Sequence, residues 1–250
     1  MARRQRLLRH AVGTALGFLS ALALAGEIPL EQRKSGYEFM GRETRAMQDD
    51  EATHPALFTL MDGETLYKSN CASCHQSMQG VTTRYPTVKD GKLRNLEQQI
   101  NACRIERQKQ PAFAYESKEL LALATYVGRQ SRGMPIEMAI NDSNRKFFEA
   151  GRATFNRRQG QLNLACTQCH DDNWGKSLAG NPIPQAHPTG YPLYRLEWQG
   201  VGSPQRRLRN CMIGVRAEPY AYGSQEFVEL ELYLMWRARG MKLETPAVRP

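Results

Sequence analysis

Outside residues 1–25 the sequence lacks any apolar run that could cross a bilayer, which takes about 20 residues. It also lacks a dense basic run after residue 9, although its formal net charge is +9. Nucleic-acid-binding proteins concentrate Lys and Arg in such a patch or segment. These absences exclude a membrane span after residue 25 and argue against a nucleic-acid partner. The remaining positive charge suits docking to acidic partners or small anions.

The first 25 residues have the pattern of a secretory signal peptide. Four arginines lie within residues 1–9, the run 11–25 is uncharged, and Ala23 and Ala25 precede Gly26. An uncleaved membrane anchor is the alternative, but 15 apolar residues are short for a span. The pattern predicts export to the periplasm and removal of residues 1–25. That removal lowers the formal net charge of +9 by four.

Four of the six cysteines belong to two copies of Cys-x-x-Cys-His, the attachment motif of haem c. The copies comprise Cys71, Cys74 and His75, then Cys166, Cys169 and His170. In such a motif the two thiols form thioethers with one porphyrin, and the histidine is the proximal iron ligand. A single copy could be a redox or zinc motif. Two copies in one exported chain predict two covalently bound haem c groups.

The sequence also repeats itself, once around each haem motif. Residues 63–67 resemble residues 151–155, and residues 103–119 resemble residues 211–226. Both copies continue into an apolar stripe at helical spacing and close on Arg-Gly-Met. The pattern indicates a duplicated domain with one haem in each copy.

The expected fold is mostly all-α, with two tandem cytochrome c-like domains at residues 51–140 and 141–250. Residues 26–50 form an extension that is expected to lie on the surface or to touch a partner. Helices are predicted near residues 63–70, 93–103, 117–130, 143–156, 204–212 and 224–238.

Cys103 and Cys211 remain, and two interpretations are open for them. Exported thiols are usually oxidised, so they could form a disulfide with each other. Alternatively, each is the sixth ligand of its own haem iron. Both occupy the same place in their repeat, where a cytochrome c domain usually carries a distal methionine, and neither repeat has a methionine there. This position favours ligation.

Other potential iron ligands are less favourable. Met134 and Met241 follow the last predicted helix of each repeat, where packing is the simpler role. His54 and His187 lie in predicted loops, where a lone histidine is more often solvated than bound to metal.

The surroundings of the two cysteines differ. Leu96 and Ile100 share an uncharged helix face with Cys103, which suits a buried structural ligand. Arg207 lies one helical turn before Cys211, where a guanidinium stabilises a thiolate and can hold an oxyanion. A solvated arginine-rich face is the alternative. The second repeat also has 42 positions between motif and cysteine, against 29 in the first. The enlarged loop predicts that the second domain is catalytic.

The residues resemble the SoxA family of dihaem cytochromes over nearly all of the chain after residue 25. The specific segments are residues 165–171, 173–176 and 191–211, which include Tyr191, Trp198 and Arg207.

This resemblance implies an L-cysteine S-thiosulfotransferase, which oxidatively joins thiosulfate to a cysteine of the SoxYZ carrier protein and passes electrons to haem and to a SoxX cytochrome subunit. It implies His75 and Cys103 as the axial pair of the first haem, and His170 and Cys211 as that of the second. It further implies that Cys211 is the active cysteine, able to carry an extra sulfur as a persulfide, and that Arg207 lies beside the substrate.

Two other functions are possible for a dihaem chain. A non-catalytic electron carrier predicts methionine ligands, which the repeats do not offer at the matching position. A dihaem peroxidase needs one open haem site, but each haem here has a candidate sulfur ligand.

Overall fold

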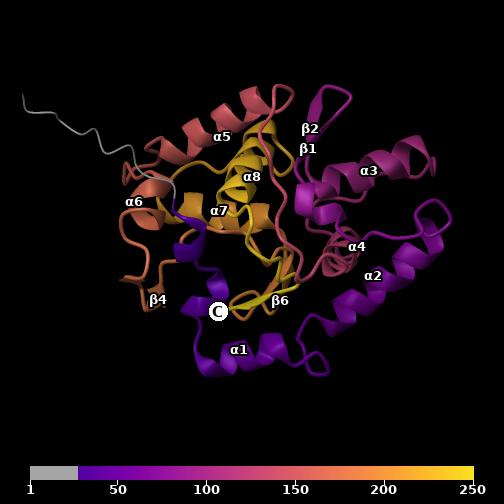
Figure 1. Ribbon diagram of the computed structural model, residues 1–250, viewed down its shortest axis with the longest axis horizontal. Helices are drawn as coiled ribbons and strands as arrows, with labels where there is room; N and C mark the ends of the chain where they lie inside the picture. The colour runs from indigo at the N-terminus through magenta and orange to yellow at the C-terminus, as the bar shows by residue number, and fades with distance from the viewer. Residues whose placement is uncertain (1–27) are drawn as a thin grey trace, which may run out of the picture.

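The computed structural model describes residues 28–250, so the predicted signal peptide lies outside the described residues. α-Helices dominate the structure, which confirms the mostly α-helical fold class (Figure 1). The helices are α1 (Arg42–Asp49), α2 (Leu57–Asn70), α3 (Leu96–Glu106), α4 (Lys118–Arg129), α5 (Arg145–Asn156), α6 (Cys166–His170), α7 (Pro204–Gly214) and α8 (Gln225–Arg237). Short 3₁₀ helices cover Leu30–Gln32, Gly36–Phe39 and Val81–Arg84.

All six predicted helices are present, as α2 to α5, α7 and α8, although α2 begins six residues earlier than predicted. The structure adds α1 in the predicted extension and α6 on the second haem motif. In Figure 1, α2, α3 and α4 lie on one side of the molecule and α5 to α8 on the other. We refer to residues 51–140 as the first half and residues 141–250 as the second half.

Short strands form three small sheets. The strands are β1 (Thr87–Lys89), β2 (Lys92–Arg94), β3 (Ser177–Leu178), β4 (Asn181–Pro182), β5 (Leu193–Arg195), β6 (Gly200–Gly202) and β7 (Val248–Arg249). β1 pairs with β2 and β3 with β4, both antiparallel. β5 is the middle strand of the third sheet, antiparallel to β6 and parallel to β7.

In each half, two helices cross with their backbones in contact at a glycine. α2 crosses α4 at Gly63, where an added Cβ would overlap the carbonyl of Ala122. α5 crosses α8 at Gly151, where an added Cβ would overlap the carbonyl of Glu229. Gly63 and Gly151 occupy equivalent places in the sequence repeat. The duplication therefore preserves the closest helix contact of each half.

The helices that carry Cys103 and Cys211 also begin in equivalent ways. Asn95 caps α3, and its side-chain oxygen accepts a hydrogen bond of 2.9 Å from the Gln98 amide. Ser203 caps α7, accepting one of 3.2 Å from the Arg206 amide, with a proline as the next residue. A cap satisfies amides that the first turn of a helix leaves unpaired. Each cysteine lies eight residues after its cap.

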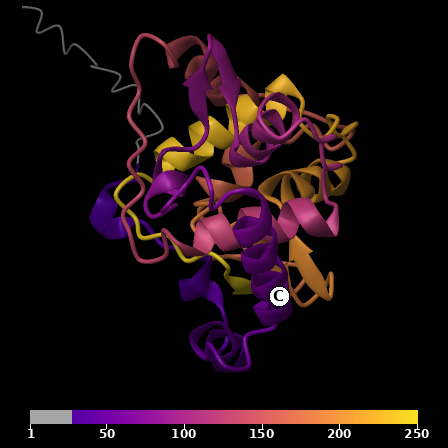
Figure 2. The ribbon, with the colours of Figure 1, turned by 90° about the vertical axis from the view of Figure 1, so that its right-hand side faces the viewer.

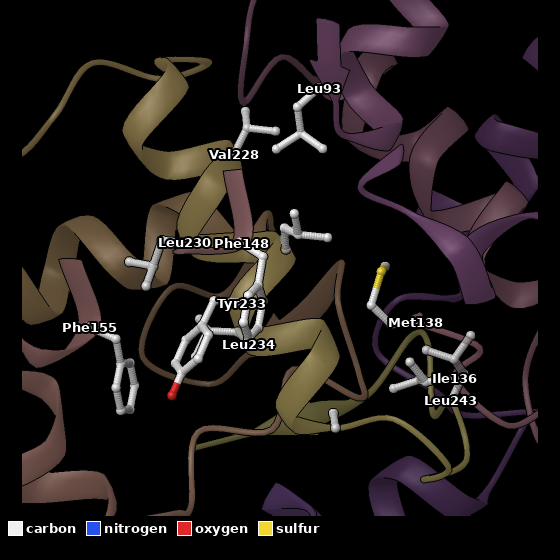
Figure 3. Packing of buried hydrophobic residues seen from close by; sticks show 12 residues of the cluster. Leu93, Ile136, Met138, Phe148, Phe155, Val228, Leu230, Tyr233, Leu234 and Leu243 are labelled. Carbon is white, nitrogen blue, oxygen red and sulfur yellow. The ribbon is translucent and has the colours of Figure 1, made fainter. Parts of the chain in front are cut away.

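The larger apolar core lies along α8 and joins the two halves (Figure 3). Phe148 and Phe155 of α5 pack against Tyr233 of α8, with ring centroids 5.6 and 5.2 Å apart. Leu93 of β2 belongs to the same cluster and lies beside Val228 (Figure 3). Figure 2 shows the hairpin of β1 and β2 next to α8. This shared core holds the two halves together.

The segment before residue 51 packs against the second half. Gln48 is buried, and its side-chain oxygen accepts a hydrogen bond of 3.1 Å from the Val248 amide in β7. The Lys34 amide donates one of 2.6 Å to Gln185, and the Lys34 carbonyl accepts one of 2.9 Å from His187. The predicted extension is thus anchored to the second half at two places.

A buried carboxylate network joins the starts of α3 and α7. Glu231 of α8 accepts hydrogen bonds of 3.1 Å from Asn95 and 2.6 Å from Gln205. Glu97 is buried nearby, and burial raises the pKa of both carboxyls. The mutual repulsion of the two charges raises the pKa of Glu231 further. Both therefore favour the protonated form in the folded protein.

Replacing either crossing glycine should destabilise the fold. Gly63→Ala or Gly151→Ala should lower the free energy of unfolding by about 1–3 kcal/mol, because the helices must separate to admit the methyl group. Gly214→Ala is the matched control, since a Cβ there meets nothing within 4 Å. Chemical denaturation of the holoprotein measures all three. Equal stability of the Gly63 and Gly214 variants would contradict the backbone contact.

The buried carboxyls should make stability fall as pH rises. Their pKa values in the folded protein lie above the ordinary 4.5, so the folded chain keeps protons that the unfolded chain releases. The free energy of unfolding should therefore decrease from about pH 4.5 through neutral pH. Glu231→Gln should reduce this decrease, because an amide does not titrate. Denaturation midpoints at several pH values test it, with exposed Glu218→Gln as a control that leaves the slope unchanged.

Candidate functional site

The second haem motif is a short helix whose histidine is oriented by the backbone. α6 contains Cys166, Cys169 and His170, and it packs against α5. His170 Nδ1 lies 2.7 Å from the Pro184 carbonyl oxygen, which can only accept a hydrogen bond. Nδ1 therefore carries a proton, which leaves Nε2, the nitrogen on the Cys211 side, as the one that can bind iron. Such an outer hydrogen bond is the usual support of a metal-binding histidine.

Cys211 of α7 meets His170 directly. Burial acts to raise the pKa of Cys211, but a hydrogen bond from His170 and the charges of Arg207 and Arg195 outweigh it, so that this pKa lies below its ordinary value. Cys166 is close enough for the Cys211 charge to act on its thiol, although burial is the main reason that the pKa of Cys166 is raised. The structure thus brings together the predicted ligand pair and the attachment cysteines of the second haem.

A cavity of about 180 Å³ opens beside this pair. His170 and Cys211 line it together with apolar side chains that include Leu193, Leu208 and Leu234. A haem c group fits this arrangement: two thiols one turn apart, an imidazole with a free nitrogen, an opposing soft sulfur and an apolar wall. Phe39 and Met40 also line the cavity, so the segment before residue 51 contributes to the site.

The first motif is less enclosed. Cys71 ends α2, and Cys74 and His75 are exposed on the turns that follow. Burial raises the pKa of Cys71, and the nearby charge of Cys103 raises it further, so these two sulfurs lie close together. The Gln99 side-chain amide donates a hydrogen bond of 3.3 Å to Cys103 Sγ.

An apolar cluster surrounds the first site and fits a haem in the same way. Tyr67, Leu123 and Val127 are its buried members, and Leu96, Ile100 and Cys71 pack against it. The predicted uncharged face around Cys103 is therefore present. All six cysteines are free in the structure, so the disulfide between Cys103 and Cys211 does not form.

Arg207 lies beside Cys211, as the helical spacing predicted. It lines the cavity. Burial acts to lower the pKa of Arg207, but the charges of Cys211, Tyr191 and Glu197 together raise it. Among the described residues, Arg207 has no hydrogen bond or ion pair. Its positive charge is therefore available to a ligand. This arrangement favours the substrate-side interpretation over a solvated arginine face.

Sequence reasoning missed two features of the site. Each half has a Tyr-Pro pair before its cysteine helix, and the cysteine charge raises the pKa of Tyr85 and of Tyr191, in addition to burial. The Tyr-Pro repeat was visible in the sequence, ahead of the cap of each cysteine helix. Arg195 lines the second cavity beside Arg207, but no spacing rule links a residue on β5 to one on α7.

The other candidate ligands have structural roles. His54 Nδ1 accepts a hydrogen bond of 3.0 Å from the Ala56 amide. His187 Nδ1 donates to the Lys34 carbonyl, although its ring also lines the second cavity. The Met134 methyl group lies near Gly80, and Met241 packs on the larger core. Within residues 28–250, no helix is long and apolar enough to cross a membrane.

Comparison with known proteins gives consistent matches. The family model "SoxA/TsdA, cytochrome c domain" matches residues 56–136 and 150–243. The L-cysteine S-thiosulfotransferase subunit SoxA of Pseudaminobacter salicylatoxidans is 33% identical over 235 residues, which cover 88% of this chain and 82% of the relative. The same subunit from Rhodovulum sulfidophilum is 32% identical, covering 88% and 81%.

A solved structure matches as well. The crystal structure of SoxXA from P. pantotrophus superposes with a TM-score of 0.84 at 31% sequence identity, and the match covers 87% of each chain. The resemblance drawn from the sequence segments is thereby confirmed.

Proposed function

This chain belongs to the SoxA family of c-type cytochromes, and on that premise we propose that it is the dihaem subunit of an L-cysteine S-thiosulfotransferase. In the proposed reaction, thiosulfate is joined oxidatively to a cysteine of the SoxYZ carrier protein. The proposed electron outlet is a SoxX cytochrome subunit, and the solved relative is a SoxXA complex. The proposed location is the periplasm, reached through the signal peptide at residues 1–25.

One observation carries the proposal: a thiol and an unpaired guanidinium share the cavity of the second haem motif. Cys211 and Arg207 both line it, together with His170. The equivalent pair in the first half is Cys103 and Gln99. In both halves the cysteine lies eight residues after the helix cap, and its partner lies four residues after the cap. Gln99 is neutral and bonds the sulfur itself. At these matched positions, therefore, the second half and not the first has a charged partner beside the cysteine, which favours catalysis there.

The residues suit the chemistry of joining two sulfurs. The Cys211 thiolate and the thiosulfate dianion together release two electrons as an S–S bond forms, leaving a cysteine S-thiosulfonate. A carrier thiolate then attacks that cysteine derivative, takes the thiosulfonate group and releases the Cys211 thiolate. Arg207 attracts and orients the anion through its planar fork. Haem c, when bound, supplies an iron centre that accepts electrons.

We propose one haem in each half. Cys166, Cys169, His170 and Cys211 would hold one of them. Cys71, Cys74, His75 and Cys103 hold the other. The family model supports this division, because its two matched segments, 56–136 and 150–243, fall within the proposed domains 51–140 and 141–250.

The mature protein should contain two haems that remain attached after denaturation. Haem counted per denatured polypeptide should be close to two, because thioether bonds survive unfolding. A variant with Cys71→Ser and Cys74→Ser should retain one, and its remaining haem should belong to the second motif. A count of one in the unaltered protein would overturn the dihaem proposal.

Cys211 and Arg207 should be required for turnover in the holoprotein. Cys211→Ala should abolish transfer of thiosulfate to the carrier cysteine, whereas Cys103→Ala should leave appreciable activity. Arg207→Ala removes a charge-assisted hydrogen bond worth roughly 1.5–3 kcal/mol, so the rate should fall about ten- to hundredfold. Arg207→Lys should recover part of it, since it keeps the charge without the fork.

The measurement is carrier modification by mass analysis, with SoxX present and haem content verified. Full activity of Cys211→Ala would show that the chain is a non-catalytic electron carrier instead.

A further inference from the structure

A second arginine shares the cavity with Arg207 and Cys211. Arg195 ends β5, lines the cavity, and has a side chain that is only 13% exposed. The Arg195 charge helps to lower the pKa of Cys211, and the Arg207 charge helps to lower the pKa of Arg195. Two guanidinium groups are therefore held close to one sulfur in a partly buried site.

Protein groups satisfy Arg195 only in part. One terminal nitrogen lies 3.0 Å from Glu197, whose side chain is 57% exposed at the rim. The guanidinium also lies 5.2 Å from the centroid of the Trp198 ring. Its Nε is buried and has no hydrogen-bond partner among the described residues. A buried donor without a partner costs free energy that a bound acceptor recovers.

The other cations near the cavity do not contribute free charge. Arg249 lines it but is paired with Glu244 at 2.5 Å and bonded to Gln48. Arg206 lies over the Trp198 ring, with 4.4 Å to the centroid, and 4.0 Å from Glu116 outside the cavity lining. Among the described residues, Glu197 is the carboxylate whose charge acts on both Arg195 and Arg207, and it does not line the cavity. An entering ligand therefore meets two guanidinium groups that no side-chain carboxylate of the cavity lining neutralises.

The positions of the first half that match Arg195 and Arg207 carry no such pair. β1 and β5 both follow a Tyr-Pro pair, which makes Lys89 the counterpart of Arg195 as the last residue of its strand. Lys89 is exposed, and it pairs across the hairpin with Lys92. Gln99 stands where the second half has Arg207. Arg195 and Arg207 thus both lie in the cavity of Cys211, the cysteine that we propose as reactive.

We propose that Arg195 is a second substrate-binding residue, and that Arg195 and Arg207 together select dianionic sulfur compounds that carry a sulfonate group and a terminal sulfur. The inference rests on the proposed function and adds its charge selectivity. Two cations attract a dianion more strongly than a monoanion of the same shape, and in a partly buried site water screens this difference little. The free Nε and the planar fork match sulfonate oxygens.

The test compares two anions that present the same terminal sulfur. Thiosulfate is a dianion, and methanethiosulfonate is a monoanion in which a methyl group replaces one charged oxygen. Calorimetric titration of the oxidised holoprotein measures the Kd of each. Arg195→Gln should weaken thiosulfate binding about ten- to hundredfold, the loss of one charge-assisted hydrogen bond, and should change methanethiosulfonate binding less than about threefold. Arg195→Lys should keep most of the preference for the dianion.

Two control variants separate charge from structure. Arg206→Gln alters the other cation over Trp198, and Lys89→Gln alters the equivalent position of the first half. Neither should change either Kd. If Arg195 had a purely structural role, Arg195→Gln would weaken the binding of both anions equally, and that result would overturn the inference. Unaltered thiosulfate binding by the Arg195→Gln variant would also overturn it.

The outcomes distinguish this inference from the proposed function. Suppose the unaltered protein binds thiosulfate, and Arg207→Gln weakens this binding while Arg195→Gln does not. The proposed function then stands, and Arg195 is excluded as a substrate-binding residue. If the unaltered protein binds no thiosulfate, both fail together.

Discussion

The contact between two helix backbones at a glycine is the constraint from which each proposed haem site is built. At Gly63 and Gly151 no side chain fits between the crossing helices. In the first half, the crossing fixes the end of α2, where Cys71 follows at once, relative to α4. α3 packs on α4 and so carries Cys103 toward Cys71. In the second half, α6 rests on α5 and α7 on α8, which brings Cys211 to His170 in the same way.

The same frame serves two different chemistries because a few side chains differ at equivalent positions. In the first half, the side-chain amide of Gln99 donates a hydrogen bond to Cys103. In the second half, Arg207 occupies the equivalent position beside Cys211 and has no hydrogen bond or ion pair among the described residues. A neutral donor satisfies a sulfur ligand and leaves nothing for a solute. An unpaired guanidinium in a partly buried site carries a cost that an incoming anion removes. Divergence of the halves therefore separates a structural site from one that is prepared for a ligand.

The sequence predicted the helices, the matched cysteines and the Arg207–Cys211 pair, because these depend on local spacing. Helical periodicity and capping residues set the positions of α3 and α7, and four residues make one turn. It did not predict that Phe39 and Met40 line the cavity, or that Glu231 joins Asn95 to Gln205. The Asn95–Glu231 hydrogen bond spans 136 positions and the Gln205–Glu231 hydrogen bond 26, so these contacts leave no periodic signal. α6 was missed because five residues are too short to show a helical pattern.

The placement of charge in the interior follows from where each group can find compensation. Glu97 and Glu231 are buried among amides with no cation bonded to them, so burial raises the pKa of both and protonation removes the charge. Arginine cannot give up its proton in this way. Arg195 has one ion pair, with the exposed Glu197, and Arg207 has none among the described residues. Both line the cavity, where an anion from solvent can bind them. Within residues 28–250, negative charge between the two halves is thus removed by protonation, whereas the Arg207 guanidinium lies beside Cys211 without an ion pair.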